Sequence, residues 1–290
     1  MREAAPILLA GLDHSGKTAL RGMLEAHPAI HVVRHLELWT RLHGWFVAGA
    51  DGRQRVVRFL ASTAVTPPLD HERLSAAAGG DFAALVRELG RQVCERAGTS
   101  RWGLQEALLE LRTGEVLREL PEARIVMLIR DPRDRYAEMR AHGTVGRGGL
   151  GAETAAWIAS ARAAMAAVGR RPDAFRVVRC EDLGRDPEAT LRALCAFLGE
   201  TFEPAMVRAL PAAPGEPLRE RDVAFVQAHA AAEMEAHGYP SRPVANPAAM
   251  LPQRLADASR WQLGRLSWRR RTRHLRPSLA WSELTCRVRS

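Results

Sequence analysis

A phosphate-binding loop is the clearest chemical signal in the sequence. Residues 11–18 read Gly-Leu-Asp-His-Ser-Gly-Lys-Thr and match the pattern G-x-x-x-x-G-K-[ST] at every fixed position. An apolar run precedes the loop and a helical pattern follows it, which is the context in which this pattern holds nucleotide phosphates. The glycines let backbone amides turn inward, and the start of a helix adds partial positive charge. The alternative is a tight turn at Gly16 with Lys17 in water.

The amino-acid composition singles out the lysine of this loop. Of the 42 basic residues, 41 are arginines and Lys17 is the only lysine. The chain has 290 residues, 47% of them hydrophobic and 26% charged, which is ordinary for one large or two small globular domains. Its four cysteines are not spaced like metal ligands or a disulfide framework.

The loop needs a sheet to hold it, and the apolar pattern predicts one. Buried strands are expected at 7–11, 30–33, 123–129 and 175–178, and helices at 17–26, 36–47, 53–63, 81–96, 152–168, 186–198 and 223–236. Continuous apolar runs separated by helical patterns indicate parallel strands. We therefore expect an α/β fold of the P-loop kind, a three-layer sandwich with a central parallel sheet of four or five strands and helices on both faces.

A second group of chemically suitable residues follows the apolar run 123–129. A nucleotide hydrolase or kinase needs an acidic residue after such a strand to hold magnesium, and Asp131 stands there. Arg130 comes first, however, and its forked guanidinium suits a terminal phosphate. The alternative for Arg130 is an ion pair with Asp131 or Asp134.

Four segments, in order, make the chain resemble the PAPS-dependent sulfotransferases (PAPS is 3′-phosphoadenosine 5′-phosphosulfate). They are residues 14–20, 24–28, 129–137 and 177–199. The last is the longest match: Val-Val-Arg-Cys-Glu-Asp-Leu is followed by Asp-Pro-Glu-Ala-Thr-Leu and Phe-Leu-Gly. The likeness covers about residues 5–240.

The resemblance implies transfer of a sulfuryl group from PAPS to a hydroxyl or amine, with adenosine 3′,5′-bisphosphate as the product and no metal required. The acceptor is expected to be a small molecule, a glycan or a peptide. The implied contacts to the 5′-phosphosulfate come from His14, Ser15, Gly16, Lys17, Thr18 and Ala19, with Lys17 also acting in catalysis. Arg130 and position 138 are the implied 3′-phosphate contacts. The implied general base is His35 or, two residues later, Glu37.

The sequence departs from the family pattern at several of these positions. The family's usual arginine or lysine is His14 here, its first threonine is Lys17, its phosphate-binding serine is Glu138, and its tyrosine before Glu181 is Cys180. Two other functions therefore stay open. One is an ATP- and magnesium-dependent small-molecule kinase, which the loop's length favours. The other is a sulfotransferase-like nucleotide-binding protein with impaired catalysis.

The positive charge of the chain belongs to its last fifty residues. The net charge is +9, and residues 241–290 contain eleven arginines and two acids, so residues 1–240 are neutral. We expect a sulfotransferase-like P-loop domain at 1–240 and an Arg/Trp-rich basic tail at 241–290. Residues 254–289 could contact a membrane surface or a protein, or pack on the main domain, whereas nucleic acid is not an expected partner. No targeting or membrane segment is recognised, which predicts a cytoplasmic protein.

Overall fold

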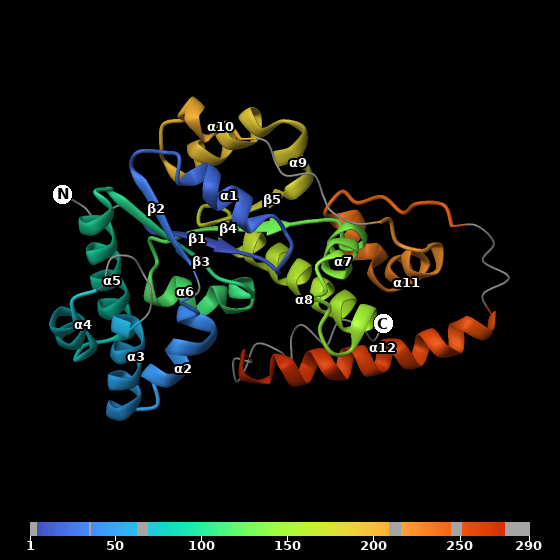
Figure 1. Cartoon of the computed structure of the whole chain (residues 1–290), viewed down its shortest axis with the longest axis horizontal. Coiled ribbons are helices and arrows are strands. Elements are labelled where there is room, and N and C mark those ends of the chain that lie inside the picture. Colours follow the sequence, from blue (N-terminus) through green and yellow to red (C-terminus); the bar gives the residue numbers. More distant parts are fainter. Residues whose placement is uncertain (1–4, 35, 63–68, 209–215, 245–250, 276–290) are drawn as a thin grey trace. The chain divides into compact units, whose positions relative to one another are not determined.

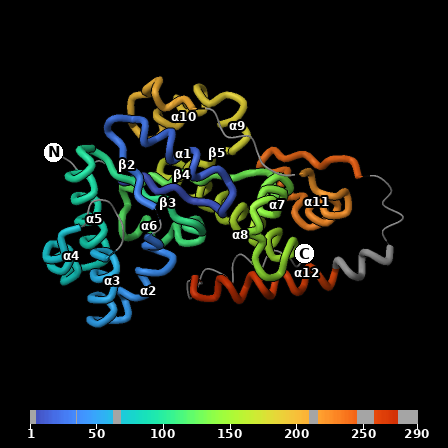
Figure 2. The backbone as a smooth tube through the Cα atoms, viewed as in Figure 1, coloured from blue at the N-terminus to red at the C-terminus, as the bar shows by residue number. Residues whose placement is uncertain are grey.

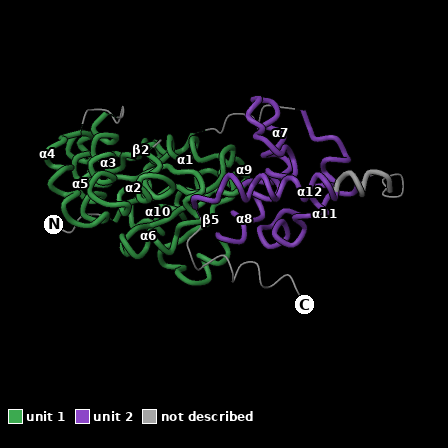
Figure 3. Tube along the Cα trace, turned by 90° about the horizontal axis from the view of Figure 1, so that it is seen from below, with its two compact units in different colours: residues 1–129, 164–211 green, residues 130–163, 212–290 purple. Residues whose placement is uncertain are grey.

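The computed structural model describes residues 5–34, 36–62, 69–208, 216–244 and 251–275, with side chains omitted at 251–257. It divides into two compact units (Figure 3). Unit 1 comprises residues 1–129 and 164–211, and unit 2 comprises residues 130–163 and 212–290. Unit 2 thus contains residues on both sides of the boundary expected at 240, and that boundary stays a prediction.

A parallel sheet forms the centre of unit 1 (Figure 1). In the described part of the chain its order is β2-β3-β1-β4-β5, with all neighbours parallel. The strands are β1 (Ile7–Ala10), β2 (Ile30–Arg34), β3 (Arg101–Gln105), β4 (Arg124–Ile129) and β5 (Phe175–Arg179). Because β1 lies in the middle, paired through Leu8 with Leu104 and Ile125, the loop that follows it starts from the centre of the sheet's carboxyl edge.

Helices cover both faces of this sheet, which confirms the predicted three-layer α/β fold. Helices α1 (Lys17–Leu24), α9 (Cys180–Arg185) and α10 (Pro187–Leu198) lie on one face, and α5 (Phe82–Ala97) and α6 (Thr113–Glu119) lie on the other (Figures 1 and 2). On the first face, apolar side chains of β1 and β4 pack with those of α1 and α10 into one buried cluster. Burial of this apolar surface is the main force that holds the layers together.

The sequence analysis did not predict β3. Its apolar signal is interrupted by Arg101, which is buried, and by Gly103. The Arg101 guanidinium donates from Nε to the Ala5 carbonyl and from Nη1 to the Leu198 carbonyl and the Glu200 carboxylate, at 2.6–2.8 Å. A buried arginine in a strand is tolerated only with such partners, and none of them is close to it in sequence.

The remaining helices of unit 1 lie mostly between β2 and β3. The helix expected at 36–47 is instead a π-helix, η1 (Leu38–Leu42), followed by the short α2 (His43–Phe46). The others are α3 (Ala50–Ser62), α4 (His71–Ala78), the 3-10 turns η2 (Leu109–Arg112) and η3 (Pro204–Met206), and the last residues of α8 (Gly149–Arg170).

Unit 2 is helical in its described part. It contains α7 (Pro132–Ala141), most of α8, α11 (Glu220–Ala236), α12 (Leu251–Arg271) and the turn η5 (Arg273–Leu275) (Figure 3). Arg133 ties α7 to α11 by donating from Nη1 to Gln227 Oε1 at 2.7 Å. Among the described residues, no helix combines the length and the apolar character that crossing a bilayer requires.

Helix α12 packs against the start of α8 through two glycines. A Cβ atom on Gly264 would lie 2.3 Å from the carbonyl carbon of Gly151 and 2.6 Å from the backbone nitrogen of Ala152. Both neighbours are backbone atoms, so they cannot move aside as a side chain would. The close approach of the two helices therefore depends on the absence of a side chain at position 264.

Gly264→Ala is expected to lower the free energy of unfolding by about 1–3 kcal/mol, because the new methyl group pushes the two helices apart. Urea unfolding followed by tryptophan fluorescence measures this. The matched control is Gly169→Ala, whose methyl group meets nothing within 4 Å. Equal stability of the two variants would contradict the packing described here.

Candidate active site

The loop at residues 11–16 is seated tightly on neighbouring backbone. Gly11 and Gly16 have left-handed φ angles of 115° and 96°. A Cβ atom on Gly11 would lie 2.3 Å from the Leu128 carbonyl oxygen, and one on Gly16 would lie 2.7 Å from Cys180 Sγ. Both positions therefore require glycine for conformation and for space. The loop rests on β4 on one side and on the start of α9 on the other.

The loop leads directly into α1 and leaves that helix without a side-chain cap. Gly16 is the N-cap residue and has no side chain to bond the first-turn amides. Lys17, 5% exposed, donates from Nζ to the Gly11 carbonyl oxygen, and Nζ lies 3.8 Å from Asp13 Oδ1. Thr18 and Ala19 follow in the first turn. This arrangement of helix start and ammonium group is suited to a phosphate or sulfate.

Ser15 supplies an independent indication of a ligand at the loop. Its side chain is 2% exposed, and its hydroxyl has no hydrogen-bond partner among the described residues. Leaving a buried hydroxyl without a hydrogen bond costs free energy. An oxygen atom of a bound anion would accept a hydrogen bond from it. The predicted loop residues His14 to Ala19 therefore lie together in one turn, next to a buried hydroxyl that has no partner in the described part of the chain.

Two buried carboxylates outside the predicted set hold the surroundings of the loop. Glu110 accepts a hydrogen bond from the Gly11 amide at 2.9 Å. Glu106, directly after β3, accepts from the amides of Trp39 and Thr40 at 3.1 and 2.6 Å. Burial raises the pKa of Glu106 to about 7, against the lowering effect of these hydrogen bonds. Sequence reasoning missed both residues because β3, the strand that precedes them, was not recognised.

The two candidates for the general base follow β2. His35 lies outside the described residues. Glu37 has a left-handed φ of 50°, and its side chain is 51% exposed and bonded to Arg41 Nη1 at 3.0 Å. Since Trp39 and Thr40 lie two and three residues after Glu37, the Glu106 carboxylate fixes the backbone shortly beyond Glu37.

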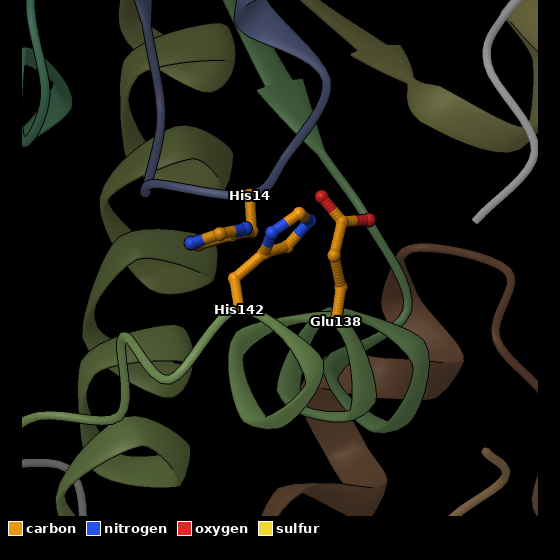
Figure 4. A group of neighbouring side chains, drawn as sticks. All are labelled: His14, Glu138 and His142. Carbon is orange, nitrogen blue, oxygen red and sulfur yellow. The ribbon is translucent and has the colours of Figure 1, made fainter. Parts of the chain in front are cut away.

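In unit 2, Arg130 is bonded to Glu138. Arg130 directly follows β4, and its Nη1 donates to Glu138 Oε2 of α7; both side chains are largely buried. The Arg130 carbonyl accepts from Trp157 Nε1 at 2.8 Å. Glu138 and His142 rise from the same side of α7, one turn apart (Figure 4). Arg130 and position 138, which the sequence analysis expected to contact a 3′-phosphate, are thus adjacent. In the structure they bind each other as an ion pair.

Asp131, the candidate magnesium ligand, is engaged in other interactions. Its Oδ1 accepts from the Arg133 amide at 2.9 Å and caps α7, while its Oδ2 lies 2.5 Å from Arg133 Nη2. Arg242 Nη2 lies 3.9 Å from Asp131 Oδ2 and 3.6 Å from Asp134 Oδ1, so it forms ion pairs with both carboxylates. The carboxylate of Asp131 therefore stabilises the start of α7.

The raised pKa of Glu106 gives a stability prediction with a definite sign. The folded protein holds this proton up to about pH 7, whereas the unfolded chain releases it near pH 4.5. Wild-type stability thus falls as pH rises between these values. Glu106→Gln removes this dependence and is expected to gain about 2–3 kcal/mol relative to wild type between pH 5 and pH 8.

Urea unfolding of wild type and Glu106→Gln at the two pH values measures this difference, and other titrating groups cancel in the comparison. Glu95→Gln, at an exposed site, is the control and should show no such gain. A difference between wild type and Glu106→Gln that does not change with pH would contradict the account of Glu106.

Comparisons with known proteins identify the family of the chain. A family model described as "Sulfotransferase family" matches residues 6–204. Solved structures that resemble the chain include the sulfotransferase domain of the Synechococcus PCC 7002 olefin synthase (20% identity, 90% of this chain and 97% of that one, TM-score 0.48). Another is the sulfotransferase from Alicyclobacillus acidocaldarius (18% identity, 82% and 97%, TM-score 0.48).

A third is the sulfotransferase STF9 from Mycobacterium avium (12% identity, 81% and 77%, TM-score 0.47). A search of the curated proteins finds no match. The match of the family model covers more than half of the chain, including the loop, every strand of the sheet and α7. The chain therefore belongs to the sulfotransferase family.

Proposed function

We propose that the protein transfers a sulfuryl group from PAPS to a hydroxyl or amine of an acceptor, releasing adenosine 3′,5′-bisphosphate. The observation that carries this proposal is the loop at 11–18. It combines an uncapped helix start, the buried ammonium of Lys17 and the unbonded hydroxyl of Ser15 in a chain of the sulfotransferase family.

The loop residues supply the donor contacts in this proposal. Backbone amides at residues 14–18 surround the 5′-phosphosulfate, and the Ser15 hydroxyl donates to one of its oxygens. Lys17 exchanges its bond to the Gly11 carbonyl for a donor oxygen. As the bond between sulfur and the bridging oxygen breaks, negative charge develops on the leaving phosphate, and Lys17 and the helix start stabilise it. This scheme requires no metal ion.

The acceptor supplies the other half of the reaction. Its oxygen or nitrogen attacks the sulfur atom while a base takes its proton, and the bisphosphate leaves. His35 or Glu37 is the proposed base, and the exposed carboxylate of Glu37 is accessible to an acceptor. Glu106 acts as a positioning residue because its carboxylate holds the two amides that follow this segment.

Arg130 is the proposed anchor of the donor's 3′-phosphate, and Glu138 opposes it. The phosphate must replace the Glu138 carboxylate at the guanidinium or share it, and the two anions repel each other. The affinity gained from a 3′-phosphate should therefore be small in the wild type. It should grow when the carboxylate of Glu138 is removed.

Calorimetric titration with adenosine 3′,5′-bisphosphate and with adenosine 5′-monophosphate tests the donor site. Lys17→Ala is expected to weaken both nucleotides at least about tenfold, the loss of one charge-assisted bond. Glu138→Ser is expected to tighten only the bisphosphate, by about tenfold, and Arg130→Ala to remove any preference for it. Arg170→Ala, at an exposed position, is the control.

Titration with ATP and magnesium, run in parallel, distinguishes the kinase alternative. Bisphosphate affinity that is the same in Lys17→Ala, Arg130→Ala and wild type would contradict the proposed donor site. Binding of ATP only with magnesium, lost in Lys17→Ala and unchanged in Arg130→Ala, would replace sulfuryl transfer by phosphoryl transfer. Tight bisphosphate binding with no turnover of PAPS on any acceptor would indicate the nucleotide-binding alternative.

A further inference from the structure

The outer face of α12 combines exposed leucines with arginines for which the described part of the chain provides no ion-pair partner. Leu263 and Leu266 are 66% and 50% exposed. Arg269, Arg270 and Arg273 are exposed, and no ion pair is found for them among the described residues. Their spacing places all five on one side of the helix and the turn that continues it. We call this set the outer face of α12.

The opposite side of α12 is fixed within unit 2. Gly264, Trp268 and Thr272 are buried there, and Ser267 Oγ donates to the Arg147 carbonyl at 2.8 Å. Arginines on this side do have acidic partners: Arg260 pairs with Asp222 at 3.3 Å and Arg271 with Glu153 at 3.0 Å. The helix thus separates two sets of arginines, one used for packing and one directed to the surroundings.

Neither component of the outer face is explained by the fold of unit 2. Exposed leucines cost free energy in water, and arginines without carboxylate partners leave a concentrated positive charge. The described residues 258–275 contain six arginines and no acid. An occupant of this face must therefore offer both apolar surface and negative charge.

We propose that the outer face of α12 docks on an anionic lipid surface, with the helix lying in the plane of the interface. Lipid phosphates would accept hydrogen bonds from the arginines, while the two leucines would enter the region between headgroups and acyl chains. A nucleic acid would satisfy the arginines but leave the leucines in water, so the observations favour lipid. This proposal does not depend on the donor or acceptor of the reaction.

Co-sedimentation of the full chain with vesicles tests the proposal. The vesicles are phosphatidylcholine alone or an equal mixture of phosphatidylcholine and phosphatidylglycerol. We expect binding to the mixture only, weakened by added salt. The triple variant Arg269→Gln/Arg270→Gln/Arg273→Gln should bind roughly a hundredfold more weakly, as three lost surface charges imply. Leu263→Ser/Leu266→Ser should bind at least about tenfold more weakly.

The matched control is Arg171→Gln/Arg185→Gln/Arg192→Gln, which removes the same charge from exposed positions of unit 1 and should bind like wild type. Equal urea midpoints would verify that all variants fold. Absence of binding to the mixed vesicles would overturn the proposal. Binding that the leucine variant retains in full, or tighter binding to a single-stranded RNA measured by fluorescence anisotropy, would overturn it as well.

Discussion

The contact of Gly11 with the Leu128 carbonyl oxygen sets the position of the loop at residues 11–16. At a would-be Cβ distance of 2.3 Å, no side chain fits, so the loop can lie directly on the carboxyl edge of β4 only with glycine there. A Cβ atom on Gly16 would likewise lie too close to Cys180, at 2.7 Å from its Sγ. Because Gly11 is held against the backbone of β4 and Gly16 against the Cys180 side chain, the path of the turn is fixed before any ligand arrives. Such preorganisation is the main way in which proteins stabilise developing negative charge.

Two buried carboxylates connect this loop to the segment that follows β2. Glu110 holds the Gly11 amide, and Glu106 holds the amides that follow Glu37. Both side chains come from the segment after β3, which lies between β1 and β2 in the sheet. The parallel order of the strands thus allows one short segment to position both the loop at residues 11–16 and the backbone that follows the candidate base Glu37. Arg130 and Glu138 belong to unit 2, where they form an ion pair on and beside α7.

The loop, the fold class and the family could be predicted from the sequence because their signals are local. Residues 11–18 carry the whole pattern in one turn, and β1 and residues 125–129 of β4 are continuous apolar runs. Glu106 and Glu110 could not be assigned, since their hydrogen bonds join residues 67 and 99 positions apart. β3 could not be predicted because its buried Arg101 depends on hydrogen bonds to the carbonyl oxygens of Ala5 and Leu198, which are far from it in sequence. For Arg130 and Glu138 the resemblance implied a shared role, whereas the ion pair between them depends on the turn of α7.

A crystal structure of the full chain with adenosine 3′,5′-bisphosphate would test most directly that the loop at 11–18 holds the leaving phosphate of the sulfuryl donor. The account predicts the 5′-phosphate at the start of α1, within hydrogen-bond distance of the Ser15 hydroxyl and the amides of residues 16–18, with Lys17 Nζ turned from the Gly11 carbonyl to a phosphate oxygen. A bisphosphate bound elsewhere, with the Ser15 hydroxyl still unbonded and Lys17 still on Gly11, would contradict it.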